Sequence, residues 1–156
     1  MSDNTEYLEI LSGKADGIEI VPTPPGEPSA MVDKNNIRET LDHCRYDRDL
    51  GFNMLVDMFA IDYNGEEPRF EIVYILRSQK TNARIVVKTR CGDEGIETVS
   101  DLWPAANFLE REIYDMYGLP FALLSTAGGR MADRIGATRA GLIGIVAAAP
   151  FTASYG

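Results

Sequence analysis

Hydrophobic positions in the middle of the chain are grouped in the short runs that strands require. The runs 55–63, 69–76 and 84–89 are rich in Phe, Ile, Val and Tyr, which favour strands. Between the first two, residues 64–68 read Asn-Gly-Glu-Glu-Pro, which is typical of a turn, so we predict a hairpin there. A shorter apolar run at 18–21 predicts one further strand.

Two other segments repeat at helical spacing. In residues 31–46, Ile37, Leu41 and Cys44 recur at i, i+4 and i+7, which predicts a helix with Asp33 as its cap. A second helix is predicted after the Ser-Asp pair at 100–101, which supplies its cap. This helix has a proline at an early position and ends at the glycine at position 118.

The faces of this second helix are predicted from a rotation of about 100° per residue. Its apolar residues fall on one arc, which is the predicted core face: Ala105, Ala106, Leu109, Ile113, Met116 and Tyr117. Glu110 is placed on the opposite, solvated arc. Glu112 projects at the edge of the apolar arc, where a lone carboxylate is costly to bury. We therefore expect Glu112 to be at least half buried and paired with backbone amides or with a cation of a neighbouring strand.

These elements predict an α+β fold. It is a two-layer domain in which a mostly antiparallel sheet of three or more strands packs against two helices. Residues 1–121 are expected to form this domain, with a proline-rich linker at 22–28 inside it. Residues 122–156 differ in composition, because Ala and Gly occupy 15 of the 35 positions. We predict that this atypical tail adds little to the core of the domain.

Charge and cysteine content exclude several classes of function. The net charge of −9 argues against nucleic acid or an anionic membrane as the main partner. The N-terminus does not read as a signal peptide and no run is long enough to span a bilayer, so we expect a soluble cytoplasmic protein. Cys44 and Cys91 are expected to be free buried thiols, and two cysteines are too few to hold an iron–sulfur cluster.

An enzyme that uses carboxylates is one alternative. Asp57, Asp62, Glu110 and Glu112 could supply an acid–base pair of the kind that hydrolyses glycosides. The sequence shows no partner nucleophile, no metal-ligand spacing and no phosphate-binding glycine loop beside them. We therefore predict no catalytic residue, no cofactor-binding residue and no metal ligand in this chain.

The most specific pattern lies in the second helix. Residues 103–107 read Trp-Pro-Ala-Ala-Asn and residues 110–118 read Glu-Arg-Glu-Ile-Tyr-Asp-Met-Tyr-Gly. Together they resemble the central motif of the 30-kDa (C) subunit of proton-pumping NADH:quinone oxidoreductase, respiratory complex I. The strand segments predicted above are similar to the family's upstream segments, so the resemblance covers about residues 37–121. The histidine- and arginine-rich ending of the family is not present after Phe121.

The resemblance implies a role inside a larger enzyme. The chain would be an accessory, cofactor-free structural subunit of the peripheral arm of a bacterial complex that transfers electrons from NADH to quinone coupled to proton translocation. FMN, iron–sulfur clusters and quinone would belong to the whole complex. The implied partners are the 49-kDa-type (D) subunit and the iron–sulfur subunits. The implied location is the cytoplasmic side of the inner membrane, without a direct span.

An interface with such a partner is predicted at five residues, which are Trp103, Glu110, Glu112, Tyr114 and Asp115. Trp and Tyr are the residues most enriched at protein–protein hot spots. The alternative for the aromatic residues is a place in the core. Two alternative functions stay open at this point: the equivalent subunit of a related membrane-bound hydrogenase complex, and a free-standing acidic adaptor that binds proteins.

Overall fold

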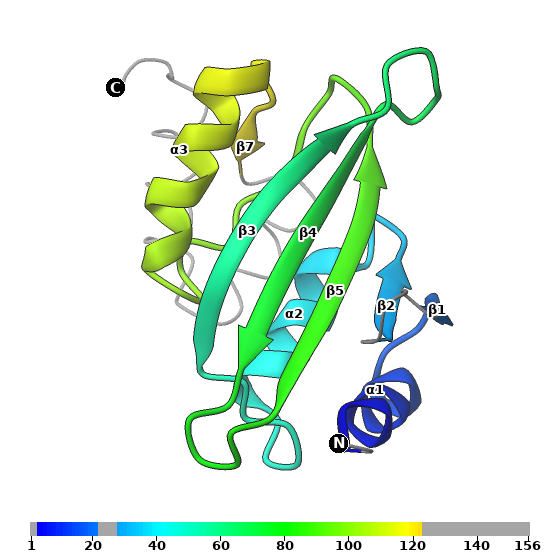
Figure 1. Cartoon of the computed structure of the whole chain (residues 1–156), viewed down its shortest axis with the longest axis vertical. Helices are drawn as coiled ribbons and strands as arrows, with labels where there is room; N and C mark the ends of the chain where they lie inside the picture. Colours follow the sequence, from blue (N-terminus) through cyan, green and yellow to red (C-terminus); the bar gives the residue numbers. More distant parts are fainter. Residues whose placement is uncertain (1–2, 22–27, 123–156) are drawn as a thin grey trace, which may run out of the picture.

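A five-stranded sheet forms the centre of the protein, in a computed structural model that describes residues 3–21 and 28–122 (Figure 1). The strand order is β1-β2-β5-β4-β3. Neighbouring strands run antiparallel, except that β2 and β5 are parallel. The strands span β1 (Ile18–Val21), β2 (Ser29–Val32), β3 (Met54–Asp62), β4 (Phe70–Arg77) and β5 (Arg84–Cys91).

Three helices accompany this sheet in the described part of the chain, namely α1 (Asp3–Lys14), α2 (Ile37–Tyr46) and α3 (Ala105–Tyr117). In Figure 1, α2 lies behind the three long strands and α3 runs alongside β3. α1 lies near β1 and contacts α2 and β5. A second, two-stranded parallel sheet joins β6 (Ile96–Glu97) to β7 (Phe121–Ala122), the segments on either side of α3.

The core lies between the main sheet and the helices. Along β5, Ile85, Val87, Thr89 and Cys91 are buried while the residues that alternate with them are partly exposed, as expected for a strand with one covered face. β4 lies between β5 and β3 and is almost wholly buried, which explains the continuous apolar run at 72–76. The predicted α+β two-layer fold with a mostly antiparallel sheet is confirmed.

The helix predicted over 31–46 is wrong at its beginning. Residues 29–32 form strand β2, in which Ala30 and Val32 are buried, and the helix begins only at Ile37. Asp33 does not cap it. Its carboxylate accepts the backbone N–H of Asn35 at 2.8 Å in the turn between strand and helix, because an aspartate competes well for a nearby turn amide.

Residues 22–27 and 123–156 lie outside the described part of the chain. Most of the proline-rich linker predicted at 22–28 and nearly all of the tail predicted at 122–156 therefore stay predictions. The hairpin predicted at 64–68 is confirmed, since β3 and β4 pair antiparallel on either side of it. Helix α1 is an element that the sequence pattern does not predict. It buries Leu8 and Leu11, which lie three positions apart.

Candidate interaction site

The two ends of helix α3 are capped differently. Gly118 ends the helix in a left-handed conformation (φ 73°) and its N–H donates to the carbonyl of Tyr114 at 2.7 Å. At the start, Pro104 stands at the cap position, and no side chain caps the first turn. The predicted cap by Ser100 or Asp101 is therefore wrong, because both side chains have partners elsewhere.

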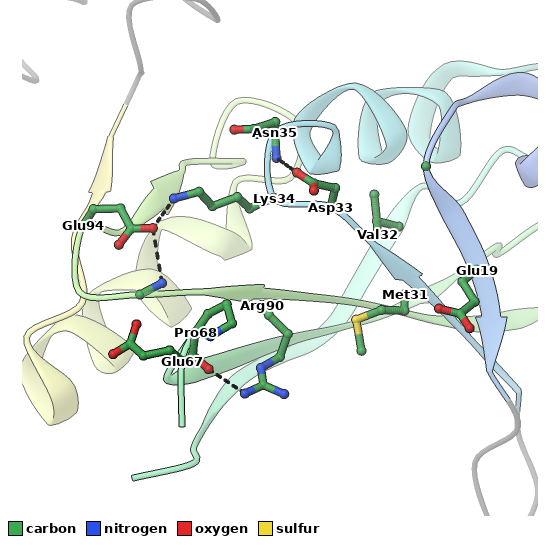
Figure 2. Close-up of a pocket in the computed structure, with 12 residues that line it drawn as sticks. Glu19, Met31, Val32, Asp33, Lys34, Asn35, Glu67, Pro68, Arg90 and Glu94 are labelled. Carbon is green, nitrogen blue, oxygen red and sulfur yellow. Dashed lines mark hydrogen bonds and ion pairs between the residues drawn. The ribbon is translucent and has the colours of Figure 1, made fainter. Parts of the chain in front are cut away.

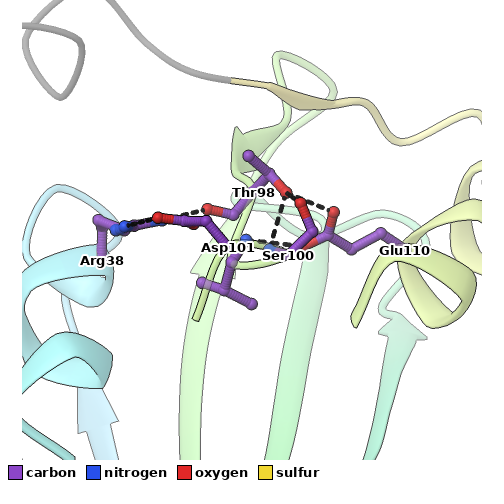
Figure 3. Close-up of polar contacts among 6 residues, drawn as sticks. Arg38, Thr98, Ser100, Asp101 and Glu110 are labelled. Atoms are coloured by element: carbon purple, nitrogen blue, oxygen red, sulfur yellow. Dashed lines mark hydrogen bonds and ion pairs between the residues drawn. The ribbon is translucent and has the colours of Figure 1, made fainter. Parts of the chain in front are cut away.

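Glu110 is the buried carboxylate of this helix (Figure 3). Its side chain is 6% exposed and points from α3 toward the loop that follows β6. The hydroxyl of Thr98 lies 2.6 Å from Oε1, and the backbone N–H of Val99 donates to Oε2 at 2.8 Å. These contacts fix the helix to the loop.

Burial raises the pKa of Glu110 to about 7. The hydrogen bonds from Thr98 and Val99 lower the pKa and so oppose this effect. The negative charge of Asp101 raises the pKa and the positive charge of Arg38 lowers it, both by less than burial does. Glu110 therefore changes its charge near neutral pH inside a packed core.

Arg38 ties the same loop to helix α2. Its side chain is buried and both terminal nitrogens bind the carboxylate of Asp101 at 2.5 Å. One of these nitrogens also donates to the carbonyl of Thr98 at 2.9 Å. A bidentate arginine–carboxylate pair fixes both distance and orientation. The loop 98–103 is thus held from one side by α2 and from the other by α3.

Trp103 lies in the core and not on a surface. It is 2% exposed, and its indole N–H donates to the carbonyl of Phe52 at 3.2 Å. Buried indole groups usually find such a partner. This placement favours the core alternative for Trp103 over a direct role at an interface.

The outward face of α3 carries large apolar side chains that no described residue covers. Phe108 is 63% exposed, Tyr114 54% and Met116 69%. Glu112 lies between Phe108 and Met116 on the helix surface, Asp115 and Arg111 are exposed on the other side of Phe108, and Tyr114 lies about 160° around the helix from Met116. We call Phe108, Glu112, Tyr114, Asp115 and Met116 the α3 face, which spans both flanks of the exposed side of the helix. An apolar group of this kind with acidic neighbours is typical of a protein-binding surface.

The predicted places of the two glutamates on α3 are wrong. Glu110, predicted on the solvated arc, is buried, whereas Glu112, predicted to be buried, is exposed, with no hydrogen bond or ion pair to any described residue. The helix geometry explains this result. Glu110 lies only about 40° from Ala106 and about 20° from Tyr117, so it belongs to the inward arc. Ala105 and Met116, both predicted in the core, are exposed.

Tyr114 and Asp115 are exposed, as a partner interface requires, but their role there stays a prediction. Arg38 and Thr98 are site residues that sequence reasoning missed. Arg38 is 63 positions from Asp101 in sequence, and no local pattern marks the pairing. The signal that could have found Glu110 is its spacing of four from Ala106 and three from Ile113, both of which are buried.

A hollow of about 520 Å³ opens beside the turn between β2 and α2 (Figure 2). Its two cationic side chains have partners in the protein. Lys34 binds Glu94, and Arg90 donates to the carbonyl of Pro68 at 2.5 Å. A small-molecule site usually keeps a few polar groups that converge on its ligand. Lys34 and Arg90 converge on groups of the protein instead.

The thiols of Cys44 and Cys91 are free and buried, as predicted. Burial raises the pKa of the Cys91 thiol to about 11 and raises that of Cys44 further. Among residues 3–21 and 28–122, no three His, Cys, Asp or Glu side chains gather in a way that could hold a metal ion. Within the same ranges, no helix is long and apolar enough to cross a membrane.

Comparison with known proteins decides the family. Residues 30–124, which include the whole α3 face, match the profile described as the respiratory-chain NADH dehydrogenase 30-kDa subunit. The chain belongs to this family. It is 40% identical over 98 residues to the C subunit of the NADH-quinone oxidoreductase of Hyphomonas neptunium, and 44% identical over 98 residues to that of Citrifermentans bemidjiense.

Each of these two matches covers 62% of this chain. It covers 48% of the Hyphomonas neptunium subunit and 60% of the Citrifermentans bemidjiense subunit. The chain thus spans about half the length of the curated relatives it matches. Its fold is also similar to a chain of the membrane-bound sulfane sulfur reductase, an archaeal respiratory membrane complex. That likeness has a TM-score of 0.65 at 26% identity and covers 76% of this chain and 70% of the other.

Proposed function

We propose that this chain is an accessory subunit of the peripheral arm of a bacterial NADH:quinone oxidoreductase and that it braces the quinone-reducing 49-kDa-type subunit. The observation that carries this proposal is the family match over residues 30–124. In this proposal the complex transfers electrons from NADH to quinone coupled to proton translocation, on the cytoplasmic side of the inner membrane. This chain holds neither the flavin nor an iron–sulfur cluster.

The α3 face is the surface that supports such docking. Phe108, Tyr114 and Met116 are more than half exposed, and aromatic residues and Met are enriched at interfaces. Two exposed acids, Glu112 and Asp115, and one exposed base, Arg111, lie among them, so a partner surface with apolar pockets and charges of both signs at its rim would complement this face. Neighbouring iron–sulfur subunits are further partners in the proposal.

The contacts beneath α3 explain how the chain could act as a brace. Glu110 binds the loop before the helix, Arg38 binds the same loop from α2, and Trp103 anchors it to the segment before β3. Each contact fixes a direction as well as a distance. The start of α3 is therefore tied, through the loop 98–103, to α2 and to the segment before β3, which suits a subunit whose task is to keep electron carriers and a quinone site at fixed separation.

The test is affinity purification of the tagged full-length chain from native membranes, followed by mass spectrometry. We expect a 49-kDa-type subunit together with flavin- and iron–sulfur-containing subunits. A Phe108→Ser, Met116→Ser double variant should lose these partners while its thermal unfolding stays unchanged. Tyr46→Ser is the matched control, because Tyr46 is 58% exposed but lies at the end of α2.

Two outcomes would contradict the proposal. A tagged chain that purifies alone from native membranes would indicate a free-standing adaptor. Equal retention of partners by the double variant and by wild type would exclude the α3 face as the docking surface.

A related membrane-bound complex is the second candidate, and the likeness to a chain of the sulfane sulfur reductase favours it. The same purification separates the two. Recovery of a flavin-containing, NADH-oxidising partner supports the first function. Recovery of a nickel-containing large subunit, with no such partner, supports a hydrogenase-type complex.

A further inference from the structure

Thr98 stands between Glu110 and Ser100, and its single hydroxyl proton cannot serve both. Its Oγ1 lies 2.6 Å from Glu110 Oε1 and 3.0 Å from Ser100 Oγ, and it also accepts the backbone N–H of Ser100 at 3.1 Å. A threonine hydroxyl has one donor and two acceptor lone pairs. Of the two oxygen contacts, Thr98 must therefore donate one and accept the other.

The protonation state of Glu110 decides which contact is which. When Glu110 is ionised it can only accept, so Thr98 donates to Glu110 and the Ser100 hydroxyl donates to Thr98. When Glu110 is protonated, Oε2 still accepts the N–H of Val99 at 2.8 Å, so the proton lies on Oε1 and is donated to Thr98. Thr98 then donates to Ser100. In both states the donor and both lone pairs of Thr98 are used.

We propose that Glu110, Thr98 and Ser100 form a proton-linked hydroxyl chain, in which uptake of a proton by Glu110 reverses both hydroxyl bonds. The chain leads from the core to the surface, because Glu110 is buried and Ser100 is partly exposed (Figure 3). Proton uptake frees the Ser100 hydroxyl proton to point outward, so that Ser100 becomes a hydrogen-bond donor at the surface. Loss of the proton turns this hydroxyl inward again.

The surroundings of Glu110 place this switch near neutral pH. The pKa of Glu110 is raised to about 7, chiefly by burial; the hydrogen bonds from Thr98 and Val99 lower it, Asp101 of the loop contributes to the rise, and Arg38 of α2 opposes it. Tyr74 of β4 also faces Glu110, and burial keeps that phenol neutral by raising its pKa.

Other acids lie on the elements that pack nearby. On β3, Asp57 accepts the N–H of Met58 and Asp62 binds Arg69. Glu97 of β6 is buried and acts on Arg38 and on Tyr74, two of the groups that surround Glu110. Of the three residues of the proton-linked chain, Glu110 is the titrating group. The proton-linked chain does not depend on the proposed docking role, since it is a property of the free chain.

The test is NMR titration of the full-length chain with ¹³C-labelled glutamate carboxyl groups. We expect one resonance with a midpoint near pH 7, which disappears in the Glu110→Gln variant. Thr98→Val should raise this midpoint, because the ionised form loses a charge-assisted donor and the protonated form loses only a neutral bond. Ser100→Ala should lower it, because the protonated form then leaves the Thr98 hydroxyl proton without an acceptor.

Both shifts are expected to be about half a pH unit or more, from the strength of the bonds lost. The opposite signs are the signature of the reversing chain, since two static hydroxyls would shift the midpoint in one direction. Glu112→Gln is the control and should leave the midpoint unchanged, because Glu112 is exposed on the same helix.

Three outcomes would overturn the proposal. They are the lack of a glutamate titration between about pH 6 and 8, shifts of equal sign in the two variants, and no shift in Ser100→Ala. Should Thr98→Val fail to fold, as judged by its amide spectrum, the Ser100→Ala result alone decides, because only the reversing chain predicts a lowered midpoint there.

Discussion

At the scale of single residues, Glu110 has opposing effects on stability. Its hydrogen bonds to the loop join two elements, but burial disfavours its charged form. A protonated carboxyl group keeps both contacts without a buried charge. The loss of folding stability caused by burying Glu110 therefore depends on pH, and it is greatest where the carboxyl group is ionised.

This dependence has a definite sign. The pKa of Glu110 is raised from the ordinary 4.5 to about 7, so the folded state holds a proton that the unfolded state releases. The stabilisation is full below about pH 4.5 and is lost as pH rises through about 7, by about 3 kcal/mol at most. We expect urea unfolding between about pH 4.5 and 8 to show this loss in wild type and not in Glu110→Gln. Parallel pH profiles would contradict the assignment.

Two glutamates on the same helix provide a matched comparison. Glu110→Ala leaves the buried N–H of Val99 without its acceptor, which should cost about 1 to 3 kcal/mol of unfolding free energy. Glu112→Ala removes an exposed side chain and should change stability by less than about 0.5 kcal/mol. Urea midpoints at about pH 7 measure both values. Equal costs would show that the loop contacts of Glu110 are not stabilising.

Residue placement on α3 was only partly predictable from the sequence. The apolar arc located Ala106 and Ile113 correctly, because both are small or aliphatic and have one preferred environment. Glu110 was misplaced because residue type outweighed helix geometry in the prediction. A buried carboxylate depends on partners from distant segments, and the sequence around α3 contains no sign of Arg38.

At the scale of elements, β6 and β7 meet where the backbone comes very close to itself. A Cβ on Gly95 would lie 2.3 Å from the carbonyl oxygen of Pro120, and Gly95 has a φ of +92°. Only glycine fits both conditions without strain. This junction brings the segment after α3 back beside the strand before it. The position of the whole helix thus depends on one small residue.

Gly95→Ala should therefore cost about 2 to 4 kcal/mol, from the steric overlap together with the unfavourable φ. Gly65→Ala is the control. Gly65 has a similar φ of +98° but no atom within 4 Å of a new Cβ, so it should cost only about 1 to 2 kcal/mol. Thermal and urea unfolding of the two variants measure the difference. If the Gly65 variant is at least as destabilised, the close approach at Pro120 is not important.

Elements with local signals were predicted well, and elements that depend on distant pairing were not. The β3–β4 hairpin has its turn residues between its strands, and Gly118 marks the end of α3. Strand β2 falls partly within the predicted helix, since its four residues carry no strong strand signal. Its parallel partner β5 lies more than 50 positions later in the chain. Periodicity within a window cannot reveal such a pairing.

At the scale of the whole molecule, the surface combines a strongly acidic charge with one helix that exposes three large apolar side chains. The net charge of −9 favours solubility of the free chain, while Phe108, Tyr114 and Met116 provide a face that can be buried. The two properties suit a subunit that is made separately and then docks onto a partner. They support the proposed role independently of the family match.

Residues 123–156, which follow β7, are expected to contribute little to the stability of the chain. They contain no Lys or Glu and are rich in Ala and Gly, so their side chains offer little apolar area for a core. Deletion of these residues after Ala122 should leave the melting temperature of the chain within about 2 °C of the full-length value. Differential scanning calorimetry of the two proteins at equal concentration measures this.

The apolar run at 141–149 is the feature that most opposes this prediction, because a buried strand could form from it. Removing a buried strand would expose several apolar side chains at once, each worth about 1.5 to 3 kcal/mol when fully buried. A loss of that size lowers the melting temperature of a domain of this length by well over about 5 °C. Such a drop would show that the tail is an integral part of the fold, and it would move the predicted boundary at residue 121 to the end of the chain.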